Sequence, residues 1–151
     1  MTGDVLVIGI GNDFRRDDGV GLAVAAEIAR RRLAGVRVMT AIGEPTSILE
    51  AWTGTPLVVA VDAAMGEGAT PGKIRRWTPG NDDQPTVVSS HAVGLPQTYA
   101  LGQALGRIPQ KLVVLTVDIE DASHGLTLTP AVAAAVPAAV DAVLAELQPD
   151  P

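Results

Sequence analysis

Short apolar runs alternate with longer segments of helical periodicity along the chain. Four runs rich in β-branched residues cover residues 5–10, 36–41, 57–61 and 111–117. Because none of these runs alternates with polar residues, each is typical of a strand buried on both faces of a sheet. The more polar run KIRRW at 73–77 is typical of an edge strand. The pattern therefore predicts a sheet of about five strands.

The segments between these runs have apolar residues at helical spacing. The helices expected from them cover residues 19–33, 47–52, 92–107 and 130–148. Thr129 and Pro130 form a cap and first-turn pair for the last helix. Pro96 is expected to disturb the start of the third helix, and Pro137 is expected to kink or reset the last one.

Strands that alternate with helices in this way are typical of the α/β class. We expect a three-layer fold: a mostly parallel, twisted sheet of about five strands, with helices on both faces and one edge strand. The length of 151 residues is that of one domain, which here would cover residues 1–151. The chain has no cysteine, which excludes disulfides, thiolate metal sites and a cysteine nucleophile.

Charge and hydropathy limit the partners and the location. The formal net charge is -6, and the arginines gather partly at 15–16 and 30–32, so no basic face for nucleic acid is expected. The longest apolar stretch, 131–140, is about half as long as a membrane span requires and contains Pro137. The N-terminus does not match a secretion signal. We therefore expect a cytoplasmic protein with no nucleic-acid or membrane partner.

Polar residues with useful chemistry follow several of the predicted strands. In open α/β sheets ligands gather beyond the carboxyl ends of the strands, so these positions are candidates for a site. Two adjacent carboxylates stand in the loop GIGNDFRRDDGVG (9–21), between the first strand and the first helix. The candidates are Asn12, Asp17, Asp18, Asp62, Ser89, Ser90, His91 and Asp118.

Two nucleotide or phosphate chemistries fit these candidates poorly. The motif G-x-G-x-x-G would need a third glycine where Phe14 stands, and the second strand ends in Thr40 and Ala41 with no acidic residue to bind a ribose. A phospho-receiver site would place its acidic pair close to the first strand and a lysine after the last strand. The chain has neither arrangement.

A divalent metal site is a third possibility. Carboxylates together with His91 supply hard oxygen donors and one imidazole, which suit Zn, Ni, Mn or Fe. Three protein ligands would leave coordination positions open, as catalysis requires.

Structural roles for the same residues stay open beside the metal site. Asp17 or Asp18 could cap the first helix, although adjacent side chains point about 100° apart and only one can cap well. Asp62 could bond to the turn that follows it, and His91 could cap the third helix. His124 could be a plain loop residue.

The order of several short motifs is specific where each motif alone is not. GIGN is followed by DDGVG, by VVAVDA with PGK behind it, by SSHAVGL and by GLTLTP. This order and spacing closely resemble the hydrogenase maturation protease family, endopeptidases that trim the large subunit of nickel-iron hydrogenases. The resemblance runs from Val5 to Pro130 and the helix after it.

The resemblance implies a phosphorylase/hydrolase-like fold and a set of site residues. Asp18, Asp62 and His91 match the three positions that bind nickel in the family, and they are the expected metal ligands and catalytic residues. Glutamate is frequent in the family at the first of these positions. Asp18 has the same charge as glutamate and would likewise bind the metal through a carboxylate oxygen. Asp17 would then serve the start of the first helix.

The resemblance also implies the partner. The family senses nickel already loaded into the immature hydrogenase, so the ion would arrive with a large-subunit precursor whose C-terminal extension is cut, and Zn or Cd could replace it in crystals. The chain itself would be a monomer or a weak oligomer.

Two stretches depart from the family pattern. TAIGEPTS (40–47) replaces a D-G-G-T-like stretch, and VDIED (117–121) stands where a glycine-isoleucine-glutamate-proline stretch is commoner. Both are expected in loops that touch the partner, where they bear on which hydrogenase is processed. A non-catalytic nickel-sensing or partner-binding module on the same fold is the alternative function.

Overall fold

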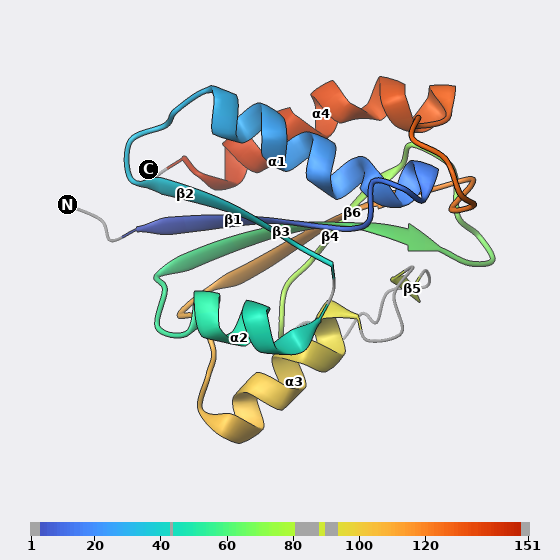
Figure 1. The fold of residues 1–151 in the computed structure, drawn as a ribbon. Coiled ribbons are helices and arrows are strands. Elements are labelled where there is room, and N and C mark those ends of the chain that lie inside the picture. Colours follow the sequence, from blue (N-terminus) through green and yellow to red (C-terminus); the bar gives the residue numbers. More distant parts are fainter. Residues whose placement is uncertain (1–3, 43, 81–87, 90–93, 149–151) are drawn as a thin grey trace.

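The computed structural model describes residues 4–42, 44–80, 88–89 and 94–148. One sheet lies between two pairs of helices, with α1 and α4 on one face and α2 and α3 on the other (Figure 1). The strands are β1 (Val5–Ile10), β2 (Val36–Ala41), β3 (Leu57–Met65), β4 (Ile74–Trp77), β5 (Val88–Ser89) and β6 (Leu112–Asp118). The helices are η1 (Arg16–Gly19), α1 (Val20–Arg30), α2 (Pro45–Trp52), α3 (Leu95–Leu105) and α4 (Pro130–Glu146).

The sheet has the topology of an open, mostly parallel α/β fold. The strand order is β2-β1-β3-β6-β4, and the short β5 pairs with β3. Strands β2, β1, β3 and β6 are parallel, whereas β4 runs antiparallel to β6. The predicted fold class is confirmed, and so is the position of the KIRRW run at an edge of the sheet.

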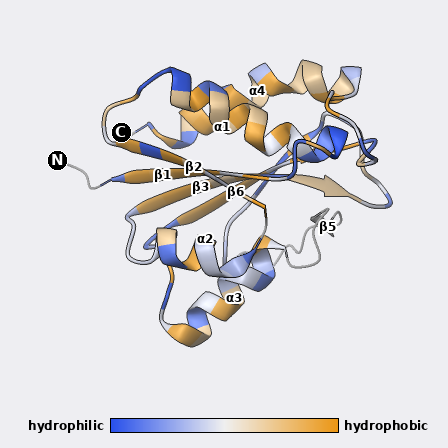
Figure 2. Ribbon diagram, viewed as in Figure 1, coloured by the Kyte–Doolittle hydropathy of each residue, from blue (hydrophilic) through white to orange (hydrophobic). Residues whose placement is uncertain are grey.

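Three of the four continuous apolar runs, now β1, β3 and β6, are strands buried on both faces, as predicted. For β2 the prediction is wrong, because this strand stands at an edge of the sheet and most of its residues are exposed or half-buried. Alternate residues along a strand point to opposite faces, so Val59 and Val61 of β3 pack under α1 and α4, while Val58 and Ala60 pack with α2 and α3. The strands stand out as hydrophobic in Figure 2. Two apolar cores therefore hold the three layers together.

Two strands end later than the sequence pattern indicates. The run 57–61 continues as β3 to Met65, because Asp62, Ala63 and Ala64 find ladder partners in β6. Asp62 therefore lies inside a strand and not directly after it. Asp118, expected after its strand, is the last residue of β6.

The prolines behave differently from their predictions. Pro96 stands in the first turn of α3, where its missing N–H is not needed, so the expectation that it disturbs this helix is wrong. Helix α4 continues through Pro137 to Glu146, and Thr129 and Pro130 open it as predicted. Among the described residues, none of the helices is long and apolar enough to cross a membrane.

Two glycines let α1 approach the sheet closely. A Cβ atom at Gly9 would collide with the carbonyl oxygen of Gly21 and with Ala25 of α1. A Cβ atom at Gly21 would collide with the carbonyl oxygens of Val61 and Ile10. The start of α1 thus rests directly on β1 and β3, and η1 is brought over the carboxyl ends of these strands.

We expect Gly21→Ala to destabilise the protein by about 1–3 kcal/mol, because the added methyl group meets backbone atoms that cannot rotate away. Urea denaturation followed by circular dichroism measures the change. Ala26→Ser, on the exposed side of the same helix, is the control and should stay within about 0.5 kcal/mol of wild type. A Gly21→Ala protein as stable as the control would show that α1 can shift at no cost.

Candidate active site

The candidate site lies at the carboxyl ends of β1 and β3 (Figure 1). The chain leaves β1 at Ile10 and returns as η1, which packs against β3. Asp18 belongs to η1, and Asp62 lies on β3 one position beyond the register pair of Gly9 and Val61. Two carboxylates far apart in sequence therefore lie at the same edge of the sheet, as predicted.

Asp18 is fully buried and oriented by the loop that precedes it. The backbone N–H of Asn12 donates a hydrogen bond to Oδ2 of Asp18 at 2.9 Å. Gly11 has φ +156°, and a Cβ atom at this position would collide with the carbonyl oxygen of Asp18. A side chain at position 11 would displace the peptide that carries this carboxylate, which explains the glycine of the GIGN motif.

Asp62 is almost as deeply buried, with 2% of its surface exposed. The backbone N–H of Ala63 donates a hydrogen bond to Oδ1 of Asp62 at 2.8 Å. This bond is to the neighbouring residue of the same strand. It helps to fix the orientation of the Asp62 side chain.

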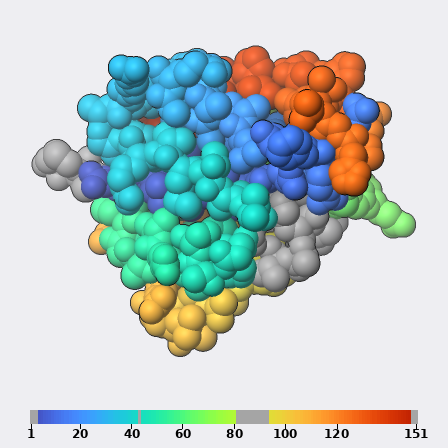
Figure 3. All heavy atoms as spheres, in the orientation of Figure 1, coloured from blue at the N-terminus to red at the C-terminus, as the bar shows by residue number. Residues whose placement is uncertain are grey.

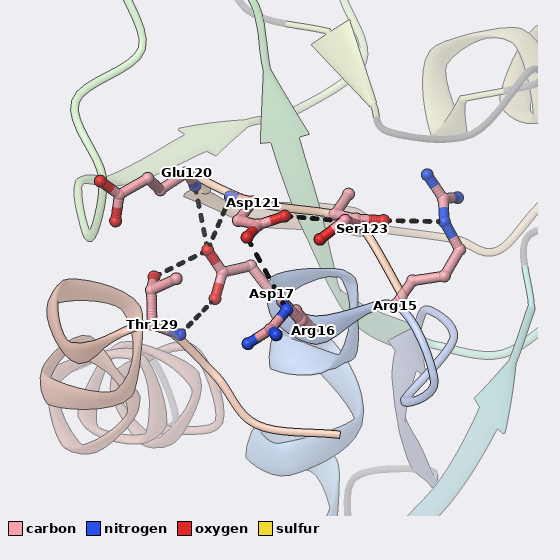
Figure 4. Close-up of polar contacts among 8 residues, drawn as sticks. Arg15, Arg16, Asp17, Glu120, Asp121, Ser123 and Thr129 are labelled. Carbon is pink, nitrogen blue, oxygen red and sulfur yellow. Dashed lines mark hydrogen bonds and ion pairs between the residues drawn. The ribbon is translucent and has the colours of Figure 1, made fainter. Parts of the chain in front are cut away.

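Asp17 does not serve the start of the helix, contrary to the prediction. Its carboxylate is fully buried and accepts hydrogen bonds from the backbone N–H groups of Glu120, Asp121 and Thr129 at 2.7–3.0 Å. The Thr129 hydroxyl donates a fourth bond to it at 2.8 Å (Figure 4). The residue before α1 is Gly19, which has no side-chain cap. Asp17 instead holds the segment between β6 and α4 against η1 by these hydrogen bonds.

Further contacts hold the same segment against η1. Arg16 N–H donates to the carbonyl of Gly125, and Gly125 N–H donates back to the carbonyl of Phe14. Arg16 and Asp121 form an exposed ion pair at 3.7 Å, and the hydrogen bonds from Ser123 lower the pKa of Asp121. The β1–η1 segment, dark blue, and the β6–α4 segment, orange, lie side by side in Figure 3. The Asp17 carboxylate is fully buried, whereas the Asp121 side chain keeps 40% of its surface exposed.

The remaining predicted site residues divide into two groups. His91 and Ser90 lie outside the described residues, and of Ser89 the structure describes only the backbone of β5. His124 is an exposed loop residue. Within the described ranges, no three histidine, cysteine or acidic residues are grouped so that they could hold a metal ion. The predicted metal site depends on His91, so it stays a prediction.

The two departures from the family pattern have structural roles. Asp118 is fully buried and accepts hydrogen bonds from Arg75 and from the Thr70 N–H at 2.9 Å each. Residues 117 and 118 end β6, so the expectation that all of VDIED is a loop is wrong. In TAIGEPTS, the Glu44 carboxylate caps α2 by accepting from Thr46 N–H and Ser47 N–H.

In open, mostly parallel α/β sheets ligands bind beyond the carboxyl ends of the strands, which is where the two buried aspartates lie. Residues 23–146 match the family model described as hydrogenase maturation protease, and the chain belongs to the hydrogenase maturation protease family. It is therefore a hydrolase of the protease class. The family resemblance read from the motifs is confirmed.

Two curated relatives agree with this assignment. The chain is 29% identical over 154 residues to the hydrogenase expression/formation protein HupD of Rhodobacter capsulatus, covering 95% of this chain and 71% of HupD. It is 23% identical over 150 residues to the hydrogenase 2 maturation protease of Escherichia coli, covering 95% of this chain and 90% of the relative.

Solved structures share the fold. The hydrogenase maturating endopeptidase HybD from Escherichia coli superposes with a TM-score of 0.79 at 22% identity, over 95% of this chain and 91% of HybD. The [NiFe] hydrogenase maturation protease HybD from Thermococcus kodakarensis gives 0.73 at 20% identity, over 96% and 99% of the two chains. At these identities the likeness supports the architecture alone.

Proposed function

We propose that this chain is the endopeptidase that removes the C-terminal extension of a nickel-loaded [NiFe] hydrogenase large-subunit precursor. The relatives named above as hydrogenase maturation proteases support the partner and the reaction. The observation that carries the proposal is the pair of buried aspartates, Asp18 and Asp62, at one edge of the sheet. Nothing in the described part of the chain favours the non-catalytic module.

The donor set suits the ion that the substrate would bring. Asp18, Asp62 and His91 would hold the nickel of the precursor by two carboxylates and one imidazole, ligand types that nickel accepts. The ion is cargo of the substrate, and when bound it supplies Lewis acidity at the scissile carbonyl or at a water molecule.

The described part of the chain contributes the orientation of the two carboxylates. Asn12 N–H and Ala63 N–H each occupy one carboxylate oxygen and fix its rotamer before the substrate arrives. Such preorganisation lowers the cost of assembling the site when the substrate binds.

The direct test is an intact-mass measurement. The protein is incubated with the large-subunit precursor of its own organism, loaded with nickel or left without it. We expect the nickel-loaded precursor to lose the mass of its C-terminal peptide and the nickel-free precursor to stay whole. If the nickel-loaded precursor binds and keeps its full mass, the chain is a binding module and the proposal fails.

A crystal soaked in cadmium or zinc tests the ligand set separately. We expect one ion bonded to Asp18, Asp62 and His91, at about 2.0–2.2 Å for zinc bonds to nitrogen or oxygen. Crystals of Asp62→Asn soaked in the same way are the matched control and should show much weaker density at this position. An ion bound elsewhere, with none at these three residues, would contradict the proposed site.

A further inference from the structure

A groove opens beside the loop that carries the candidate catalytic carboxylate. It has a volume of about 550 Å³, which is within the range of ligand-binding clefts. It runs between the β1–η1 segment and the β2–α2 segment, and its lining includes Asn12, Phe14, Leu22 and Ile42. Asn12 donates its backbone N–H to Asp18, so one wall of the groove is directly continuous with the candidate site.

The groove carries apolar side chains that the fold does not use. Phe14 is 65% exposed and Ile42 is 72% exposed, so neither contributes much to the core. Both line the groove together with the half-buried Leu22. Large apolar side chains exposed together in a concave surface are typical of a binding site.

The charge of the groove limits which kind of protein segment can bind in it. Asp13 and Glu44 line it, and none of the lining residues that the structure describes is a lysine or an arginine. The hydrogen bonds from Thr46 and Ser47 lower the pKa of Glu44, so its carboxylate stays ionised at neutral pH. An acidic segment would therefore be repelled, and a neutral or basic one accepted.

Strand β2, beside the groove, favours a bound peptide in extended conformation. Among the described strands, β2 pairs only with β1, so its other edge keeps backbone donors and acceptors that no described strand uses. Thr40, on this strand, also lines the groove. A peptide in extended conformation can bond to such an edge while placing side chains in an adjacent pocket.

We propose that this groove binds an extended, non-acidic segment of the substrate protein next to the scissile bond, and that Phe14 and Ile42 select an apolar side chain in it. This inference rests on the proposed function. It adds the two residues that determine specificity and the chemical class of the segment they contact.

The kinetic test separates binding from chemistry. Because Phe14 and Ile42 would contact substrate before and during cleavage alike, Phe14→Ala and Ile42→Ser should each raise KM by about tenfold or more with kcat nearly unchanged. Leu105→Ala is the matched control, since Leu105 is 56% exposed on α3 and does not line the groove. Wild-type KM values in both groove variants would overturn the inference.

A crosslinking test distinguishes failure of the groove from failure of the proposed function. Phe14 is replaced by photoreactive benzoylphenylalanine in the otherwise wild-type chain, and the nickel-loaded precursor is irradiated with it and mapped by mass spectrometry. We expect crosslinks within the C-terminal segment of the precursor. Crosslinks on another part of the precursor, or none, overturn the groove even if the wild type cleaves. Crosslinks at the C-terminal segment without cleavage by the wild type uphold the groove and refute the protease.

Discussion

Asp62→Asn and Asp18→Asn are each expected to reduce processing of the nickel-loaded precursor by at least about 10²–10³-fold, the effect of losing one group that stabilises charge in a transition state. Asparagine keeps the size of the side chain and can still accept the hydrogen bonds from Ala63 and Asn12. It removes the negative charge that a metal-bound site needs. The rate of product formation, followed by intact mass, measures the loss.

The control for these variants is Asp141→Asn, which removes an exposed carboxylate from α4 and should leave the rate unchanged. Thermal unfolding of all three variants shows whether a loss of activity reflects a loss of folding. A folded Asp62→Asn protein that cleaves at the wild-type rate would exclude Asp62 from the reaction.

The fold was largely predictable because three of its strands, β1, β3 and β6, are buried on both faces. Strand β1 contains no polar side chain, so the apolar run in the sequence has the same bounds as the strand, Val5–Ile10. The pattern is less reliable where a strand continues into polar residues. Asp62 ends the apolar run, yet pairing with β6 carries β3 on to Met65. Strand ends depend on the partner strand, which the local sequence does not contain.

The candidate site was predictable only in part for the same reason. The motif order places Asp18 and Asp62 at one edge of the sheet, and the structure does so too. The role of Asp17 could not be read locally, because an acidic residue ahead of a helix is a normal capping residue. Its bond with Thr129 spans 112 positions. One signal was available: only one of two adjacent carboxylates can cap well, which left the second in need of another partner.

The hydrogen bonds of Asp17 give the second prediction with a large effect, which concerns the stability of the protein. Asp17→Ala is expected to destabilise the protein by about 2–4 kcal/mol, because four donors lose a buried acceptor and part of that loss is recovered by hydration at the surface. Urea denaturation measures the change. Thr129→Val removes only the hydroxyl bond and should cost about 1 kcal/mol.

Amide hydrogen exchange distinguishes this role from helix capping. If Asp17 fastens the β6–α4 segment, Asp17→Ala loses protection at the N–H groups of Glu120, Asp121 and Thr129, while the first turn of α1 keeps it. If Asp17 were a cap, the pattern would be reversed and the destabilisation would be about 1 kcal/mol. Processing should fall in Asp17→Ala as well, because the adjacent Asp18 belongs to the same turn of η1 and loses its fixed position when that turn is released.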